Sequence, residues 1–199
     1  MRIRVNPTRM ELLRLRRRIA LARRGHKLLK DKLDGLVQRF FGIKNDFLGL
    51  HNTLEPGLAA IFLKTVMASA LSEPAAFAPG GEPATVRRTS RNIMGVRIPQ
   101  YDLQITGRPV YNDLLASVEQ KEALDKFRAA LPELVRLAGL GQALRLIAVQ
   151  IGETRRRVNA LEYVLIPELE RNARSIMMKL AEQERSTRVV LLKLSKEGR

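Results

Sequence analysis

The N-terminal part of the chain carries an apolar repeat whose spacing alternates between three and four residues. Twelve of the thirteen repeat positions are apolar, whereas a chain that is 45% hydrophobic would place about six apolar residues there by chance. The average spacing, about 3.5 residues, is a heptad repeat, which predicts a left-handed coiled coil. The thirteen positions are Leu12, Leu15, Ile19, Ala22, His26, Leu29, Leu33, Leu36, Phe40, Ile43, Phe47, Leu50 and Leu54.

The length of this repeat requires a partner. A helix over residues 8–54 would be about 70 Å long at about 1.5 Å per residue, so its apolar face needs an equally long cover. A second heptad repeat lies nearer the C-terminus, and its phase shifts past Pro167 as in a stutter. We therefore expect a mainly α protein, in which the N- and C-terminal helices form a long antiparallel two-helix coiled coil with both termini at one end. The second repeat comprises Leu144, Ile147, Ile151, Thr154, Val158, Leu161 and Leu165, then Leu169, Ala173, Ile176, Leu180, Val190 and Leu194.

Residues 1–199 are expected to form a single elongated subunit. Its first segment, 8–71, is the N-terminal coiled-coil helix, which starts at a capping box formed by Thr8 and Glu11. Pro56 is expected to kink or restart this helix, since it lacks a backbone N–H.

The segment 72–111 is expected to be a loop and β-hairpin insertion. Prolines and glycines exclude a helix at 79–83, and the β-type residues that follow predict a small hairpin with strands at about 92–98 and 101–106. The segment 112–199 is expected to hold the C-terminal helices of the coiled coil. They should begin near Asn112 or Asp113, and their early part is weakened by Pro132, Gly139 and Gly141.

Four glycines lie within residues 8–54 of the first helix: Gly25, Gly35, Gly42 and Gly49. Each costs about 1 kcal/mol relative to alanine in an isolated helix. The last three are seven residues apart on one edge of the seam, so they indicate either close approach of a neighbouring element or tolerated surface positions.

The sequence contains no catalytic constellation that we recognise. It has no Cys and only two His, which excludes disulfides and makes a structural zinc site improbable. Gly80-Gly81 is not followed by the Lys-Ser/Thr of a phosphate-binding loop, and His26, on the seam, is expected to be an inward, partly solvated structural residue. We therefore expect a non-catalytic protein with no catalytic residue, metal or cofactor. The longest apolar run, Leu58–Leu63, stops at Lys64, and no signal peptide is expected, so we predict a soluble intracellular chain.

The net charge of +16 is concentrated in the terminal segments. Residues 1–30 hold eleven Lys and Arg against one acid, and residues 168–199 hold eight basic against five acidic residues. In an antiparallel hairpin these segments share one end, and the basic side chains surround most of the helix rather than one side. Such a collar suits insertion into an acidic or polar socket, while the alternative is a solvated basic helix.

Three stretches resemble one known family. Asn6–Leu13, continuing through Ala22–Lys32, is similar to the opening of the D subunit of the V-type and A-type rotary ATPases. Arg156–Pro167 resembles the C-terminal signature of that family, and Arg91–Pro99 resembles its middle segment. The matches follow the family's order and span nearly the whole chain.

The resemblance implies a central rotor shaft, which couples ATP synthesis or hydrolysis to translocation of H⁺ or Na⁺. Its implied partners are the catalytic A and nucleotide-binding B subunits of the A3B3 hexamer, the F subunit, and the membrane-ring adaptor of the C or d type. The chain would then lie in the cytoplasm, held on the cytoplasmic face of the cell membrane through the complex, without inserting into the membrane or binding nucleic acid.

Two sets of residues follow as expectations. Weak, exchangeable contacts of exposed arginines would let the shaft slide against the hexamer. Interdigitated apolar side chains would stop the two helices of the shaft from sliding past each other. The expected hexamer-bearing contacts are Arg9, Arg14, Arg16, Arg17, Arg18, Arg23, Arg24, Arg174, Arg185 and Arg188. The expected coiled-coil core is Leu12, Leu15, Ile19, Leu29, Leu33, Leu36, Phe40, Ile43, Phe47, Val158, Leu161, Leu165, Leu169, Ile176 and Leu180.

Two other classes remain open from the residues alone. A basic coiled coil that binds nucleic acid would fit the charge, but aromatic residues are only 5% of the chain and no groove-reading module is recognisable. A membrane-surface adaptor would place the basic tip on anionic lipid, but these arginines do not border an apolar face.

Overall fold

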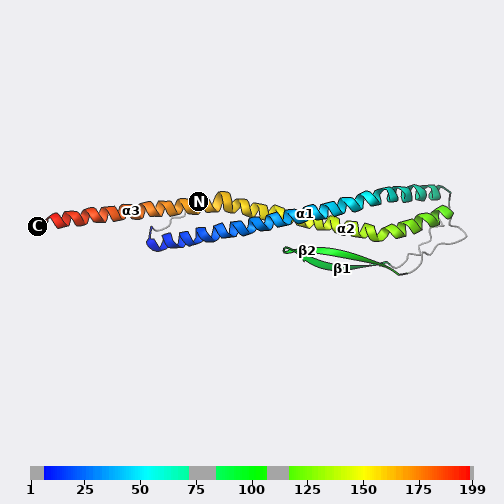
Figure 1. Cartoon of the computed structure of the whole chain (residues 1–199), viewed down its shortest axis with the longest axis horizontal. Helices are drawn as coiled ribbons and strands as arrows, with labels where there is room; N and C mark the ends of the chain where they lie inside the picture. The colour runs from blue at the N-terminus through cyan, green and yellow to red at the C-terminus, as the bar shows by residue number, and fades with distance from the viewer. Residues whose placement is uncertain (1–6, 72–83, 107–116, 198–199) are drawn as a thin grey trace. The chain divides into compact units, whose positions relative to one another are not determined.

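The computed structural model describes residues 7–71, 84–106 and 117–197. Its elements, in chain order, are helix α1 (Arg9–Leu71), strands β1 (Ala84–Ile93) and β2 (Val96–Ile105), helix α2 (Val118–Asn159), the π-helical segment η2 (Ala160–Leu165) and helix α3 (Ile166–Glu197) (Figure 1). The prediction of a mainly α protein with long N- and C-terminal helices and a small central hairpin is confirmed.

The chain divides into two compact units. One, here called the terminal unit, contains α1 up to Asp34 and the chain from Gly152 onward, and the other, the hairpin unit, is Gly35–Ile151. Each unit therefore contains part of α1 and part of the returning helical stretch.

Side-chain caps set the starts of α1 and α2. The Thr8 hydroxyl accepts a hydrogen bond from the backbone N–H of Glu11 at 3.2 Å, as predicted, but the Glu11 carboxylate lies 3.6 Å from Arg14 instead of returning to Thr8. A complete capping box starts α2, where Ser117 Oγ accepts from the Gln120 N–H and Gln120 Oε1 accepts from the Ser117 N–H. The predicted helix start at Asn112 or Asp113 lies outside the described residues.

Prolines do not divide the long helices. Helix α1 continues through Pro56, so of the two predicted alternatives, a kink or a restart, the restart does not occur, and α2 continues through Pro132. A proline inside a helix costs about 3 kcal/mol, but Leu54 and Ile61, on either side of Pro56, are both buried and hold α1 helical by tertiary packing.

The phase shift near Pro167 coincides with η2. The N–H of Ile166 donates to the carbonyl of Leu161, five residues back, which is the π-helical pattern. Proline has no N–H to bond the carbonyl four residues before it and clashes with that carbonyl. A wider turn just before Pro167 relieves this conflict and rotates the following apolar residues around the helix.

The hairpin has different bounds from those predicted. The strands pair antiparallel with Ile93 opposite Val96, and the turn is Met94-Gly95, both with positive φ, not Pro99-Gln100. The Asn92 side chain accepts a hydrogen bond from the N–H of Gly95 and stabilises this turn. Pairs in an antiparallel ladder alternate between hydrogen-bonded and non-hydrogen-bonded, and counting from the turn makes Ser90–Pro99 a non-hydrogen-bonded pair. Pro99 thus fits inside β2 because its missing N–H would not face β1.

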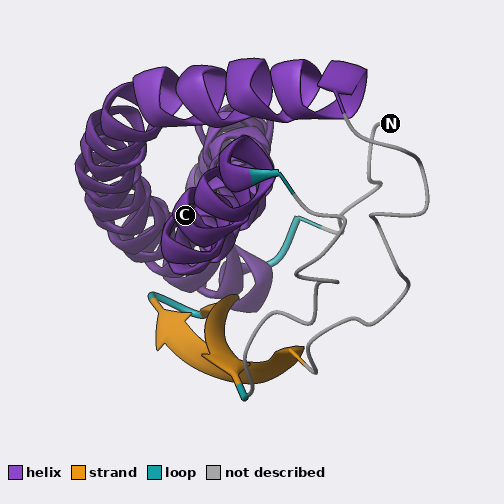
Figure 2. Ribbon diagram, turned by 90° about the vertical axis from the view of Figure 1, so that its right-hand side faces the viewer, coloured by secondary structure: helices purple, strands orange, loops and turns teal. Residues whose placement is uncertain are grey.

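The core of the hairpin unit has three contributors. Leu36 and Ile43 of α1, Val96 and Ile98 of β2, and two residues of α2, Ala143 and Ile147, form one buried cluster. Figure 2 shows the two strands as a twisted ribbon. Leu36 and Ile147 are the largest side chains that are fully buried. Phe40 is half-buried and packs against this cluster.

The terminal unit is an antiparallel helix pair. Arg9 forms an ion pair with Glu184 at 2.7 Å, Arg23 forms one with Glu170 at 2.6 Å, and His26 Nε2 lies 3.3 Å from Glu162. The residue number of the partner falls as the residue number in α1 rises, so the two helices run antiparallel. His26 is inward and partly solvated, as predicted, with 21% of its side chain exposed. The buried side chains of this unit are Leu15, Thr154, Val158 and Ile176.

Only one of the four glycines that α1 holds between residues 9 and 54 meets a close neighbour. A Cβ added at Gly35 would lie 2.6 Å from the Met94 methyl carbon, whereas Gly25, Gly42 and Gly49 have open space around that position. The close approach that the sequence suggested is thus the hairpin turn against Gly35, and the other three are tolerated positions.

Glycine substitutions should separate these two situations. Gly42→Ala should raise the free energy of unfolding by about 0.5–1 kcal/mol, because alanine favours the helix and nothing obstructs its Cβ. Gly35→Ala should raise it less, because Met94 must move. Urea denaturation of both variants checks this, and an equal gain would contradict the close contact.

Core truncations should follow burial rather than side-chain size. Leu36→Ala should lower the free energy of unfolding by about 2–5 kcal/mol, as for other fully buried leucines. Phe40→Ala, which would cost about 3–5 kcal/mol at a fully buried site, should cost less than that because Phe40 is half-buried. Denaturation of the two variants side by side measures the order, and a larger loss for Phe40→Ala would contradict it.

Candidate functional site

The candidate bearing residues all lie on the surface of the terminal unit. The ten predicted arginines are exposed. Arg9 and Arg23 make ion pairs with α3, Arg14 and Arg185 pair with acids three residues away on their own helices, and Arg16 lies 3.9 Å from the Met177 sulfur. Among the described residues, no ion pair or hydrogen bond holds the other five, which are Arg17, Arg18, Arg24, Arg174 and Arg188.

The ion pairs of this surface are of the weak kind. The Arg9–Glu184 pair has 79% and 48% of its two side chains exposed. Such pairs contribute about 0–1 kcal/mol because water screens them. The sequence could place the arginines off the seam, but not their partners, because a pair across two helices depends on their register.

The predicted core residues differ in how much of each side chain is buried. Leu15, Leu36, Ile43, Val158 and Ile176 are buried, and most of the others are half-buried. Leu165 is 42% exposed, contrary to prediction, because it lies in η2, where the wider turn carries it off the seam. The half-buried positions are Leu12, Ile19, Leu29, Leu33, Phe40, Phe47, Leu161, Leu169 and Leu180.

Helix α3 continues past the start of α1. Arg9, the first residue of α1, pairs with Glu184, while α3 runs on to Glu197 (Figure 1). We call residues 189–196 the α3 overhang. Every residue in it is exposed, including five apolar ones, with Leu192 at 64%. The predicted seam positions Val190 and Leu194 lie here, past the point at which α1 begins, and no helix of the described ranges lies opposite them. The five apolar residues are Val189, Val190, Leu191, Leu192 and Leu194.

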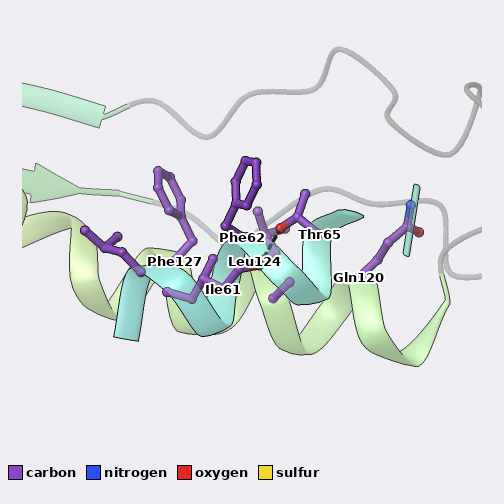
Figure 3. A pocket seen from close by; sticks show the side chains of 8 residues that line it. Ile61, Phe62, Thr65, Gln120, Leu124 and Phe127 are labelled. Atoms are coloured by element: carbon purple, nitrogen blue, oxygen red, sulfur yellow. Dashed lines mark hydrogen bonds between the residues drawn. The ribbon is translucent and has the colours of Figure 1, made fainter. Parts of the chain in front are cut away.

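A second apolar surface lies in the hairpin unit, where α1 approaches its end and α2 begins. It is a groove of about 460 Å³, which we call the distal groove. The rings of Phe62 and Phe127 project to the same side of the two helices (Figure 3). Phe62 is 72% exposed, and the Gln120 side-chain nitrogen is buried without a hydrogen-bond partner among the described residues. The groove is lined by Leu58, Ile61, Phe62, Thr65, Gln120, Ala123, Leu124 and Phe127.

An ion pair joins the two helices at this end. Lys64 of α1 bonds Glu122 of α2. This hydrogen bond and the lysine charge lower the pKa of Glu122, and the same hydrogen bond raises the pKa of Lys64. The pair therefore favours the folded state at neutral pH, and its contribution is lost as the pH falls through the lowered pKa of Glu122.

The described residues offer neither a metal site nor strong evidence of a membrane span. No group of three or more His, Cys, Asp or Glu that could hold a metal ion is found in 7–71, 84–106 or 117–197. The continuous helical stretch Val118–Lys196 contains one 18-residue window of mean hydropathy 1.4 with at most two charged residues, which is sufficient by length and composition to cross a membrane. A single such helix is weak evidence of a membrane span, because length and composition alone define it.

Comparisons with known proteins all identify the same family. Residues 11–196 match the family described as the D subunit of ATP synthase. The chain is 42% identical over 192 residues to a V-type ATP synthase D subunit of Clostridium botulinum strain Langeland, covering 92% of this chain and 89% of that relative. It is 40% identical over 188 residues to a V-type ATP synthase D subunit of Thermoanaerobacter sp. strain X514, covering 90% of each chain.

The family match covers Ala22–Lys32, Arg156–Pro167 and the hairpin, and it includes the last three residues of Asn6–Leu13. A family match over most of the chain, with relatives of this identity and coverage, is sufficient to assign membership. The chain belongs to the family of V-type ATP synthase D subunits, which are components of rotary, membrane-associated ATPase complexes.

Proposed function

We propose that the chain is the central rotor shaft of its rotary ATPase and has no catalytic role of its own. It couples ATP synthesis or hydrolysis in the A3B3 hexamer to translocation of H⁺ or Na⁺. The observation that carries this proposal is the α3 overhang, an exposed apolar helix end beyond the start of α1.

The overhang is apolar around most of its circumference. Consecutive residues of an α-helix are separated by about 100°, so Val189, Val190, Leu191 and Leu192 point in four different directions. A helix that is apolar all round is normally buried, which supports insertion of this end into a partner. Because hydrophobic contact is not directional, such an end can occupy a socket without favouring one rotational angle.

The exposed arginines support the same role. All ten are exposed on the terminal unit, and five of them have no partner among the described residues. Acidic or polar groups lining the hexamer cavity could exchange between them as the shaft turns, since each exposed contact contributes only about 0–1 kcal/mol. The bearing in this proposal combines an apolar tip with a basic collar.

The distal groove supports a second docking site, for the membrane-ring adaptor of the C or d type. Its lining is nearly all apolar, and Phe62, Leu63 and Met67 are all more than half exposed beside it. The F subunit is the further partner that this proposal expects on the hairpin unit. Through these partners the chain would be peripheral on the cytoplasmic face of the membrane, with no span of its own.

Charged substitutions in the two apolar surfaces should affect different partners. Leu191→Asp with Leu192→Asp should weaken binding to the A3B3 hexamer at least tenfold and leave ring-adaptor binding unchanged. Phe62→Asp with Met67→Asp should do the reverse. All four side chains are exposed, so folding of the free chain should be preserved. Pull-downs of tagged variants against purified A3B3 and ring adaptor measure both affinities; the same effect of both variants on both partners would contradict the assignment.

The basic collar should be tested separately. Replacing Arg17, Arg18, Arg24 and Arg174 with glutamine should lower hexamer affinity by about thirtyfold if the four contacts together contribute about 2 kcal/mol. A matched variant with Lys44, Arg87, Arg88 and Arg97 replaced by glutamine removes the same charge from the hairpin unit.

The matched variant should bind the hexamer normally and retain coupling of ATP hydrolysis to ion transport. Equal losses in the two variants would show that net charge, and not a bearing, is responsible. Tight, salt-sensitive binding of DNA by the wild type, with no binding to A3B3, would instead favour a nucleic-acid-binding function.

A further inference from the structure

We propose that the hairpin unit contains a binding site for a phosphoryl group, in a pocket formed where the hairpin meets α1 and α2. The pocket has a volume of about 360 Å³. Its lining includes three arginines from three different elements: Arg39 of α1, Arg91 of β1 and Arg136 of α2. We call it the three-arginine pocket, and it is separate from the bearing and docking surfaces described above.

The fold places these three exposed arginines around one pocket. Arg91 is paired with Ile98, and cross-strand partners project from the same face of a hairpin. Ile98 is buried against the helices, so Arg91 projects toward the helices as well.

The two helical arginines share faces with residues that contact the hairpin. Arg39 is four residues before the core residue Ile43, and Arg136 is four residues before Leu140, which packs on the same core. Residues four apart lie on one face of a helix. The convergence therefore follows from the packing of all three elements.

The charges of this pocket are not satisfied within the protein. Within 7–71, 84–106 and 117–197, none of the three guanidinium groups makes an ion pair or hydrogen bond. One acid, Asp46, also lines the pocket, and it makes no ion pair with any described residue. Three cations and one anion leave a local charge of about +2, which matches a phosphate dianion.

The chemistry of the lining favours a phosphoryl oxyanion over a simple halide. Guanidinium groups present planar pairs of N–H donors that fit two oxygens of a phosphate. The floor is apolar, with Ile43, Ile98 and Leu140, and the Tyr101 ring lies against α2, where a Cβ added at Gly139 would be 3.4 Å from it. The pocket therefore has space beside the arginines for an organic group attached to the phosphate.

A bound phosphoryl group would also fasten the hairpin. It would bridge Arg91 on the strand to the helical arginines, which otherwise repel one another. Free phosphate and the phosphates of a nucleotide share this chemistry, so the experiment compares them as probes.

The test uses isothermal titration calorimetry on the full chain, with inorganic phosphate, pyrophosphate and ADP without metal as probes. Wild type should show saturable binding that weakens as NaCl is raised. Replacing Arg39, Arg91 and Arg136 with glutamine should weaken binding at least tenfold. The control variant, with Lys44, Arg88 and Arg97 replaced by glutamine, carries the same charge change outside the pocket and should bind within about twofold of wild type.

A gain of affinity provides the second measurement, because misfolding cannot mimic it. Asp46→Asn removes the one repulsive charge and should tighten binding by about threefold or more. ADP binding that is stronger than pyrophosphate binding would show that the apolar floor holds the organic group, whereas equal affinities would assign the pocket to the phosphoryl group alone. The proposal is overturned by the absence of saturable binding, by equal weakening in the two triple variants, or by weaker binding of Asp46→Asn.

Discussion

Two helices cover each other along only one narrow stripe, and this limit governs how the chain packs. A seam residue in such a pair keeps part of its surface in water unless a third element covers it. In the hairpin unit that element is β2, and the two largest fully buried side chains, Leu36 and Ile147, lie in the cluster that Val96 and Ile98 complete. In the terminal unit, the described part of the chain provides only helices, and most of the seam there is half-buried.

This difference in packing separates the two tasks that the proposed function requires. Resistance to sliding needs interdigitated side chains, and these are densest where the hairpin covers the seam. Contact with a surrounding hexamer needs exposed side chains that hold no fixed partner, and these dominate the terminal unit and the α3 overhang. Under this proposal, the surface of the terminal unit is left uncovered within the chain because a partner covers it in the complex.

The sequence predicted those features that depend on local periodicity. None of the thirteen positions of the first repeat is exposed, because the heptad phase fixes which side of α1 faces its partner. The position of the hairpin turn is not a local property, because Pro99 lies inside β2, and only the register from Met94-Gly95 shows that its missing N–H does not face β1. The capping box at Ser117 and Gln120 corresponds to a local Ser-x-x-Gln pattern, which is a helix-start signal in the sequence. The cross-helix ion pairs and the three-arginine pocket could not be foreseen, since both depend on register between distant segments.

The three-arginine pocket is best understood from the weakness of the hairpin itself. A two-stranded ribbon is marginally stable in water, so its order depends on its attachment to the helices. Apolar burial of Val96 and Ile98 favours that attachment, while mutual repulsion of Arg39, Arg91 and Arg136 opposes it. An anion that neutralises the arginines removes only the opposing contribution, because the apolar contacts are the same with or without it. If the pocket binds a phosphoryl group, occupancy and hairpin attachment must therefore strengthen each other, by the reciprocity that links any two coupled equilibria.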